Sequence, residues 1–337
     1  MLLRYAARRV LLLIPILVGV TIITFILTRI IPGNPVDRMV SPLASAQTRQ
    51  EVIHANGLDQ PLYRQYFSYV DRLVHFDFGT SFTTSHAVAD DLTSRFAATF
   101  ELTSYAMLLA LIGALILGVA AAVWRNTIVD HVARVISVSG VATPSFWLAL
   151  TLIYLFFYRS HIMPAPTGRI DPLINPPQHI TGLFTVDALV TGDWNALSSA
   201  VASLIVPVIV LAFPAMAPIA RLTRAGMIEA LESDYTRATR SLGIPARTVV
   251  LKYCLKNALL PIVTYAGIVY GFLLGGSVLV ENIFAWPGLG LYAFNAISAS
   301  DFPAIQGFIV YATTVYITIF LVLDLLYAFL DPRIKYT

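Results

Sequence analysis

Long runs of apolar residues dominate the chain. Six of them have the length of about 20 residues that a helix needs to cross the roughly 30 Å hydrocarbon core of a bilayer. These runs cover residues 10–31, 102–124, 135–158, 201–220, 258–280 and 305–330. The pattern predicts an all-α polytopic membrane protein, with six transmembrane helices in a single domain over residues 1–337.

Basic residues precede the first apolar run, as they do in a secretory signal peptide. The run is longer than the apolar core of such a peptide, and no small-x-small cleavage site follows it. We therefore expect residues 10–31 to remain as the first transmembrane helix.

Two long polar segments interrupt the apolar pattern. Residues 33–100 form the first, and the helical spacing of apolar positions at 63–73 predicts a short surface helix within it. The segment is too long for a simple connection, so we expect it to pack as a cap that contacts a partner. The second segment is rich in proline and separates residues 158 and 201. Its stretch 183–194 forms either a short interfacial helix or an irregular excursion.

Composition and charge agree with a membrane protein. Apolar residues make up 57% of the chain and charged residues only 12%, whereas soluble domains have about 25% charged residues. With the N-terminus inside and six crossings, most of the 22 basic residues fall on the inner side, as the positive-inside rule requires. The internal segments then hold Arg4, Arg8, Arg9, Arg125, Arg134, Arg221, Arg224, Arg237, Arg240, Arg247, Lys252, Lys256, Arg333 and Lys335. Both termini are predicted to lie inside, and the single Cys254 excludes an intramolecular disulfide.

The sequence offers no recognisable catalytic or metal site. It has no G-x-x-x-x-G-K-[ST] phosphate-binding motif, and none of its three lysines follows a glycine. The six histidines are dispersed and lie outside the apolar runs, so we expect no metal site and no cofactor. A membrane-embedded enzyme would need a catalytic dyad within reach of one span, and none is visible. Nothing indicates a nucleic-acid partner; membrane lipid is the expected surrounding.

Charge is scarce within the predicted spans. Arg29, Glu101 and Glu281 are placed at helix ends, and Asp324 is the exception, either bonding to another helix or facing water. Ion-coupled carriers need ionisable groups or broken helices near the membrane midplane. The pattern therefore favours a transporter driven by an external motor, with an ion-coupled secondary transporter of small solutes as the alternative.

Two predicted helices carry residues typical of moving or pathway-lining elements. Proline favours kinks, and glycines spaced four apart allow close helix approach. The candidates for the translocation pathway are Pro207, Pro214, Gly267, Gly271 and Gly275, accompanied by Pro218, Pro261 and Gly276. Static packing remains the alternative for each of them.

The internal loop 221–257 differs from all the others. Ser233 or Asp234 can cap a short helix, and Gly243 can end it with a positive φ. Pro245 suits the first position of a following helix. The short helix has a narrow apolar stripe, formed by Tyr235, Ala238 and Leu242, beside Arg237 and Arg240. A helix resting on lipid would show a broad apolar face flanked by lysines. The stripe therefore favours docking of a protein, with the small Ala238 allowing close approach and the two arginines fixing orientation.

The same loop resembles the cytoplasmic EAA loop of permease subunits of binding-protein-dependent ABC importers. Its E-A-A-x-x-x-G pattern aligns on residues 237–243 and keeps Ala238 and Gly243. Arg237 replaces the glutamate, as is usual in the dipeptide/oligopeptide/nickel branch. Thr239 and Leu242 depart from that branch, and the downstream I-x-L-P pattern is not kept at residues 253–256.

Further motifs from end to end are similar to the dipeptide permease B-type subunits of that branch. They are Arg8-Arg9 with Ile14-Pro15, Pro32-Gly33-Asn34-Pro35, Gly57-Leu58-Asp59-Gln60-Pro61, Asp77-Phe78-Gly79-Thr80-Ser81, Phe284-Ala285-Trp286-Pro287-Gly288-Leu289-Gly290 and Asp331-Pro332-Arg333-Ile334. The insertion at residues 167–194 is similar to theirs as well.

The resemblance implies a multi-pass subunit of the bacterial inner membrane, with residues 33–100 as a periplasmic loop. It implies a second, unlike permease subunit, two cytoplasmic ATPase subunits that bind ATP and Mg, and a periplasmic substrate-binding protein. Coupling to the ATPase is expected at Asp234, Tyr235, Arg237, Ala238, Arg240, Leu242 and Gly243. The expected cargo is a dipeptide or short peptide, while oligopeptides, glutathione, haem and nickel chelates stay open.

Overall fold

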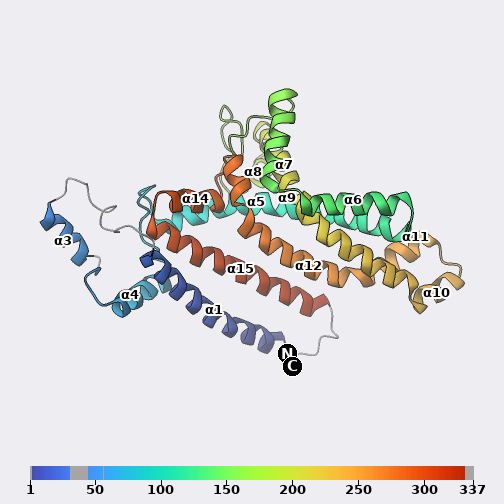
Figure 1. Cartoon of the computed structure of the whole chain (residues 1–337), viewed down its shortest axis with the longest axis horizontal. Coiled ribbons are helices and arrows are strands. Elements are labelled where there is room, and N and C mark those ends of the chain that lie inside the picture. Colours follow the sequence, from blue (N-terminus) through green and yellow to red (C-terminus); the bar gives the residue numbers. More distant parts are fainter. Residues whose placement is uncertain (1, 31–44, 56, 331–337) are drawn as a thin grey trace. The chain divides into compact units, whose positions relative to one another are not determined.

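The computed structural model describes residues 2–30, 45–55 and 57–330, with side chains for residues 11–28, 45–55, 57–275 and 277–322. Regular structure in these residues is helical, apart from an isolated bridge between Thr80 and Ala87 (Figure 1). The motifs at 32–35 and 331–334 lie outside the described residues, as do the side chains of Arg8, Arg9, Arg29 and Asp324.

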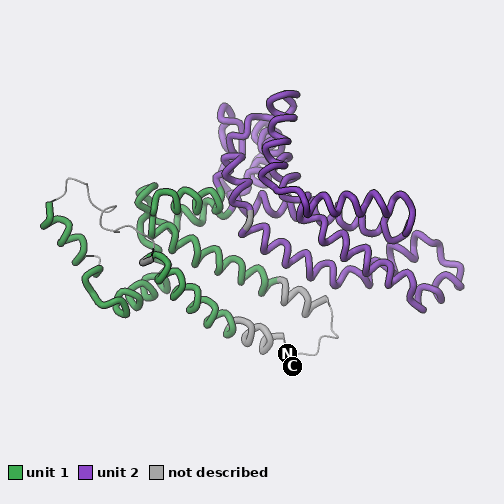
Figure 2. The backbone as a smooth tube through the Cα atoms, in the orientation of Figure 1, with its two compact units in different colours: residues 1–96, 288–337 green, residues 97–287 purple. Residues whose placement is uncertain are grey.

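The chain groups into two compact units (Figure 2). Unit 1 comprises residues 1–96 and 288–337, and unit 2 comprises residues 97–287. The single domain over residues 1–337 stays a prediction. Helix α5 (Val88–Val123) begins in unit 1 and continues into unit 2.

Unit 1 is built on two long helices that pack side by side. Its helices are α1 (Leu2–Ile30), α3 (Ala46–Ala55), α4 (Leu62–Val74), α14 (Leu289–Ser298) and α15 (Phe302–Leu330). Helices α1 and α15 contact each other, and the Gln306 amide donates a 2.6 Å hydrogen bond to the Thr28 hydroxyl. The surface helix expected at 63–73 is confirmed as α4. It packs on α1 through Phe25, whose ring centroid lies 5.5 Å from that of Tyr66.

The Asp77–Ser81 motif fastens the segment after α4 to the start of α15. Ser81 donates a 2.6 Å hydrogen bond to the buried Asp301 carboxylate, which also accepts the Thr83 amide at 3.0 Å. Gly307 in α15 allows close packing against Val88, because a Cβ at position 307 would lie 2.5 Å from Val88 Cγ1. The motif therefore has a structural role in unit 1.

Unit 2 is organised around α9 (Trp194–Glu232), which packs against several neighbouring helices. Besides α9 and the part of α5 from residue 97, the described helices of unit 2 are α6 (Ile128–Ala142), α7 (Ser145–Leu152), η1 (Ile153–Arg159, a π-helix), α8 (Phe184–Thr191), α10 (Asp234–Ser241), α11 (Ala246–Thr248), η2 (Val249–Cys254, a second π-helix), α12 (Leu255–Gly276) and α13 (Val278–Ile283). Glycines permit close approaches to α9: a Cβ at Gly113 would lie 2.5 Å from Met216 Sδ, one at Gly118 would lie 2.5 Å from Thr223 Cβ, and one at Gly140 would lie 2.8 Å from the Phe213 carbonyl oxygen. The prolines inside α9 do not end it.

Two features of the helices differ from the sequence pattern. Residues 135–158 were predicted as one span, but they fall in two helical segments bent by 102° at Thr143 and Pro144. Proline disfavours the helical conformation of the residue before it, which explains the break. Helices α5 and α9 extend beyond the predicted runs 102–124 and 201–220 into polar sequence. Five described helices are long and apolar enough to cross a membrane, or six if the bent pair counts as one span.

The longer α5 changes the position of Glu101. The sequence placed this residue at a helix end, but it lies inside α5, where it is fully buried and paired with Arg169 at 2.6 Å. Glu101 also accepts the Thr185 hydroxyl at 2.7 Å. These bonds tie the 159–194 segment to α5, because a buried carboxylate needs partners.

The short helix considered at 183–194 is present as α8, and a buried carboxylate shapes the turn before it. Asp187 accepts the amides of residues 180, 181 and 182 and the hydroxyl of Thr181. Burial alone would raise the pKa of Asp187, but these hydrogen bonds outweigh it and hold the pKa below its ordinary value. The segment is therefore a fixed turn followed by a helix.

Candidate functional site

The loop between α9 and α12 forms a compact helical turn. Helix α9 ends at Glu232 because Ser233 is extended, with φ −68° and ψ 153°. Helix α10 follows directly, and the Ser233 carbonyl accepts the amides of Thr236 and Arg237 at 3.1 and 3.2 Å. After a short turn, the chain runs through α11 and η2 into α12. Helix α10 is thus connected at both ends to long helices of unit 2.

Thr236 fixes the inner face of α10. It is fully buried, and its hydroxyl donates a 2.7 Å hydrogen bond to the Ala230 carbonyl at the end of α9. The same oxygen lies 3.4 Å from Sγ of the fully buried Cys254 in η2. The Ser233 hydroxyl also donates to Ala230, at 2.6 Å. The base of α10 is therefore held against both α9 and η2.

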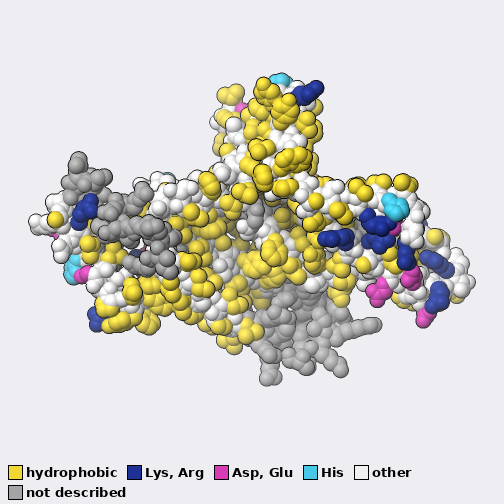
Figure 3. Space-filling view, viewed as in Figure 1, with side chains coloured by type: hydrophobic (Ala, Val, Ile, Leu, Met, Phe, Trp, Pro, Cys, Tyr) yellow, Lys and Arg dark blue, Asp and Glu magenta, His cyan; other side chains and the backbone are white. Residues whose placement is uncertain are grey.

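The outer face of α10 carries the predicted stripe. Ala238 is exposed, and Tyr235 and Leu242 are 39% and 79% exposed. Arg237 pairs with Asp234 within the helix, whereas Arg240 has no ion pair among the described residues. Figure 3 shows charged side chains gathering at this end of unit 2, while hydrophobic side chains cover the helices leading to it. The fold thus presents a small apolar surface edged by charge.

Gly243 ends the turn as the sequence predicts. Its φ is +73°, a value that side chains disfavour, and its amide donates to the Arg240 carbonyl at 3.0 Å. The prediction for Pro245 was wrong by one residue. Pro245 occupies the cap before α11, and Ala246 is the first helical residue. The reason is its extended ψ of 137°, which ends the turn without starting the helix.

A buried ion pair supports this end of unit 2. The Asp130 carboxylate of α6 is fully buried and accepts Nε and Nη2 of Arg224 from α9, at 2.8 and 2.9 Å. Nearby, Arg125 pairs with Glu232 at 2.5 Å. A bidentate guanidinium–carboxylate pair fixes orientation as well as distance. The end of α9 that carries α10 is consequently tied to α6 and to the turn before it.

Sequence reasoning missed the residues that support the outer face of α10. It identified the exposed stripe but not the inner Thr236 and Cys254 or the Asp130–Arg224 pair. One signal was available: Thr236 directly follows Tyr235 of the stripe, so it points to another side of the helix. The partners of Thr236 and Asp130 could not be read from spacing, because they come from other elements.

The candidate pathway residues belong to two helices that pack against each other in unit 2. Pro207 and Pro214 lie within α9, whereas Gly267, Gly271 and Gly275 lie within α12. Gly267 and Gly271 are buried. Gly275 is exposed, and a Cβ there would meet nothing within 4 Å. Their assignment to a pathway stays a prediction.

Comparison with known proteins places the whole chain in one family. Residues 114–336 match the family described as binding-protein-dependent transport system inner membrane component, and residues 2–103 match the N-terminal region of such membrane components. A probable D,D-dipeptide transport system permease protein of Escherichia coli K12 is 43% identical over 322 residues, which cover 96% of this chain and 94% of that protein.

Two further relatives align over almost their full length. A dipeptide transport system permease protein of Alkalihalophilus pseudofirmus is 41% identical, covering 99% of this chain and 100% of that protein. A glutathione transport system permease protein of Escherichia coli O1:K1 is 37% identical, covering 99% of each chain. The chain therefore belongs to the binding-protein-dependent transport system inner-membrane components and is a multi-pass permease subunit of an ABC importer, not an enzyme.

Proposed function

We propose that this chain carries dipeptides or short peptides across the bacterial inner membrane as one of two unlike permease subunits. A periplasmic binding protein delivers the cargo, and two cytoplasmic ATPase subunits bind ATP and Mg and supply the energy. The peptide assignment rests on the dipeptide names of the most similar relatives reported above, and the glutathione relative is itself a transporter of a peptide-like molecule.

The observation that carries the coupling proposal is the two-sided character of α10. Its inner face is fixed by the buried Thr236, whereas the residues expected to contact the ATPase lie outward with Ala238 at the centre. A partner that grips this outer face would therefore act on a helix held against the end of α9 and η2. Movement of the ATPase pair would pass to α9 and α12 together.

Transport then follows an alternating-access cycle. Closure of the ATPase pair moves α10 and re-orients α9 and α12 to open the path outward, and ATP hydrolysis returns it to the inside. Pro207 and Pro214 supply points of bending in α9, and Gly267, Gly271 and Gly275 supply a smooth face on α12. No bond of the peptide is broken.

The orientation we propose has both termini and α10 in the cytoplasm and α4 in the periplasm. Ser81 and Cys254 are both buried, so neither is a good labelling position. Tyr63→Cys and Leu242→Cys place thiols at sites that are 60% and 79% exposed. In intact cells, a membrane-impermeant maleimide should label the first at once and the second only after lysis; the opposite order would reverse the proposed topology.

A charge at the centre of the α10 surface tests the coupling. Ala238→Asp should abolish co-purification of the ATPase subunits while the permease stays in the membrane, because the carboxylate would be buried in the interface. Ala246→Asp is the matched control, exposed at the first position of α11, where an acidic residue is favourable. Retention of the ATPase by Ala238→Asp would exclude this surface as the docking site.

A further inference from the structure

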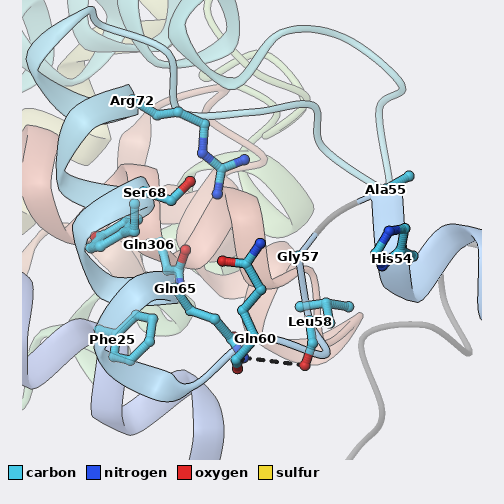
Figure 4. Close-up of a pocket in the computed structure, with 11 residues that line it drawn as sticks. Phe25, His54, Ala55, Gly57, Leu58, Gln60, Gln65, Ser68, Arg72 and Gln306 are labelled. Carbon is cyan, nitrogen blue, oxygen red and sulfur yellow. Dashed lines mark hydrogen bonds between the residues drawn. The ribbon is translucent and has the colours of Figure 1, made fainter.

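Unit 1 contains a cavity of about 390 Å³ beside α4, remote in sequence from the α10 loop (Figure 4). This volume falls in the range of about 300–1,000 Å³ that is typical of small-molecule sites. Its described lining residues are Phe25, His54, Ala55, Gly57, Leu58, Gln60, Gln65, Ser68, Tyr69, Arg72 and Gln306. They come from α1, α3, α4, α15 and the turn between α3 and α4.

Hydrogen bonds fix the shape of that turn. The Gln65 amide donates to the Gln60 carbonyl at 2.7 Å and to the Leu58 carbonyl at 3.2 Å. Gly57 adopts φ +63°, and Nδ1 of His54 lies 2.7 Å from the Asp59 carboxylate. These interactions within the chain therefore fix the shape of the cavity wall that faces α4.

A buried hydroxyl in the cavity wall has no hydrogen-bond partner among the described residues. Tyr69 is 6% exposed, and within the described residues its phenolic oxygen makes no hydrogen bond. An unsatisfied buried polar group is costly, so native proteins nearly always give it a partner. Burial raises the pKa of Tyr69 far above its ordinary value, so the phenol keeps its proton and can donate.

The other polar groups of the cavity favour an anion. Arg72 has no ion pair among the described residues, and Figure 4 shows Arg72 and Gln60 extending toward the same space from opposite walls, with Ser68 beside them. Gln306 also lines the cavity, and its side-chain amide donates to the Thr28 hydroxyl. The described lining includes a guanidinium, a phenol, a hydroxyl and a carboxamide as donors, and no carboxylate.

We propose that this cavity binds the carboxylate of a small molecule, with Arg72 as the charged partner and the Tyr69 hydroxyl as a buried donor. A guanidinium matches the geometry of a carboxylate, and a donor in a buried wall strengthens that bond. On the proposed function, the terminal carboxylate of a short peptide is the expected occupant. A free amino acid offers the same chemistry.

Calorimetric titration of the full-length chain in lipid nanodiscs tests the site without the other subunits. The dialanine peptide should bind saturably, and dialanine amide, which lacks the carboxylate, should bind at least tenfold more weakly. Equal affinity for the acid and the amide would overturn the proposal. Alanine as a third probe identifies the source: weaker binding than dialanine supports a peptide site, and equal binding supports a free amino acid.

Substitutions in α4, each with an exposed control on the same helix, test whether Arg72 and Tyr69 contact the bound carboxylate. Arg72→Gln should weaken dialanine binding at least tenfold, whereas Arg64→Gln, exposed and outside the cavity, should not. Tyr69→Phe should weaken binding about tenfold, the value of a hydrogen bond to a charged group, without lowering the melting temperature. Tyr63→Phe is its exposed control. Equal effects of Arg72→Gln and Arg64→Gln would refute the assignment.

The experiments distinguish a failure of the carboxylate-binding proposal from a failure of the proposed function. Arg72→Gln should retain the ATPase subunits in co-purification, because α10 is untouched. Loss of dialanine binding with the ATPase retained supports both proposals. Absence of dialanine binding in the wild-type chain, with normal ATPase docking, would reject the cavity alone.

Discussion

The hydroxyl at the base of α10 can be removed with little change of side-chain shape by Thr236→Val. The variant loses the bond to the Ala230 carbonyl, worth about 1 kcal/mol net, and leaves the Cys254 thiol without its oxygen neighbour. Ala230 keeps the bond from Ser233, so its carbonyl is not orphaned. We therefore expect the attachment of α10 to α9 and η2 to weaken by about 1–2 kcal/mol in total.

Cys254 provides the assay, since it is the only cysteine in the chain and is fully buried. A maleimide can reach this thiol only when the contact opens, so the labelling rate follows the free energy of local opening. A loss of about 1–2 kcal/mol corresponds to labelling roughly 5–30 times faster, measured by mass spectrometry of the purified chain. The affinity for the ATPase should fall by no more than the same factor.

Thr239→Val is the control on the same helix. Its hydroxyl donates to the Tyr235 carbonyl, at 2.5 Å within α10, and within the described part of the chain it makes no hydrogen bond to η2. This variant should leave Cys254 labelling nearly unchanged. If both variants label at the same rate, Thr236 does not fix α10 and the reasoning fails.

Three further changes test other parts of the structure. Gly243→Val should impair ATP-driven peptide uptake in reconstituted vesicles, because φ +73° disfavours a β-branched side chain, whereas Gly19→Val, in helix α1 with nothing within 4 Å of an added Cβ, should transport normally. Arg224→Ala should lower the free energy of unfolding by about 3 kcal/mol or more by leaving the buried Asp130 without its main partner, and adding Asp130→Asn should recover part of that loss in thermal unfolding. The lowered pKa of Asp187 stabilises the fold above its unfolded pKa of about 3.9, and this stabilisation is lost as pH falls through the folded value; Asp187→Asn should therefore flatten the acid-side fall in melting temperature between pH 7 and 3.

The positions of the helices could be predicted from the sequence better than their lengths. Apolar runs end where charge begins, but α5 starts at Val88, before the run at 102, with Asp90 and Asp91 favourably placed in its first turn. A hydropathy pattern reports contact with lipid, whereas a helix continues as long as its backbone bonds are satisfied. Pro144 inside the third run is a signal for a helix break. The long apolar run around it nevertheless led to the prediction of a single span.

The outer face of α10 was predictable because it is local. Ser233, the exposed stripe of α10 and Gly243 lie within a dozen residues; Gly243 ends the turn as the capping rule predicts, whereas the Ser233 side chain makes no capping hydrogen bond to the described residues of α10. The supports of the surface depend on distant residues, as Cys254 and Asp130 show. The cavity beside α4 was not predicted as a site: the sequence indicated the motif at 57–61 and the helix at 63–73, but not that they form one wall with α1, α3 and α15.

The Asp130–Arg224 pair has a consequence for how the chain enters the membrane during synthesis. The two residues are 94 positions apart, so at roughly 5–20 residues per second Arg224 emerges on the order of 5–20 seconds after Asp130. Asp130 lies in the first turn of α6, so throughout that interval its carboxylate lacks its main partner at the end of the helix and not at its centre. The bidentate pair that joins α6 to α9 forms only once Arg224 has been made, so the final packing of α6 depends on a later part of the chain.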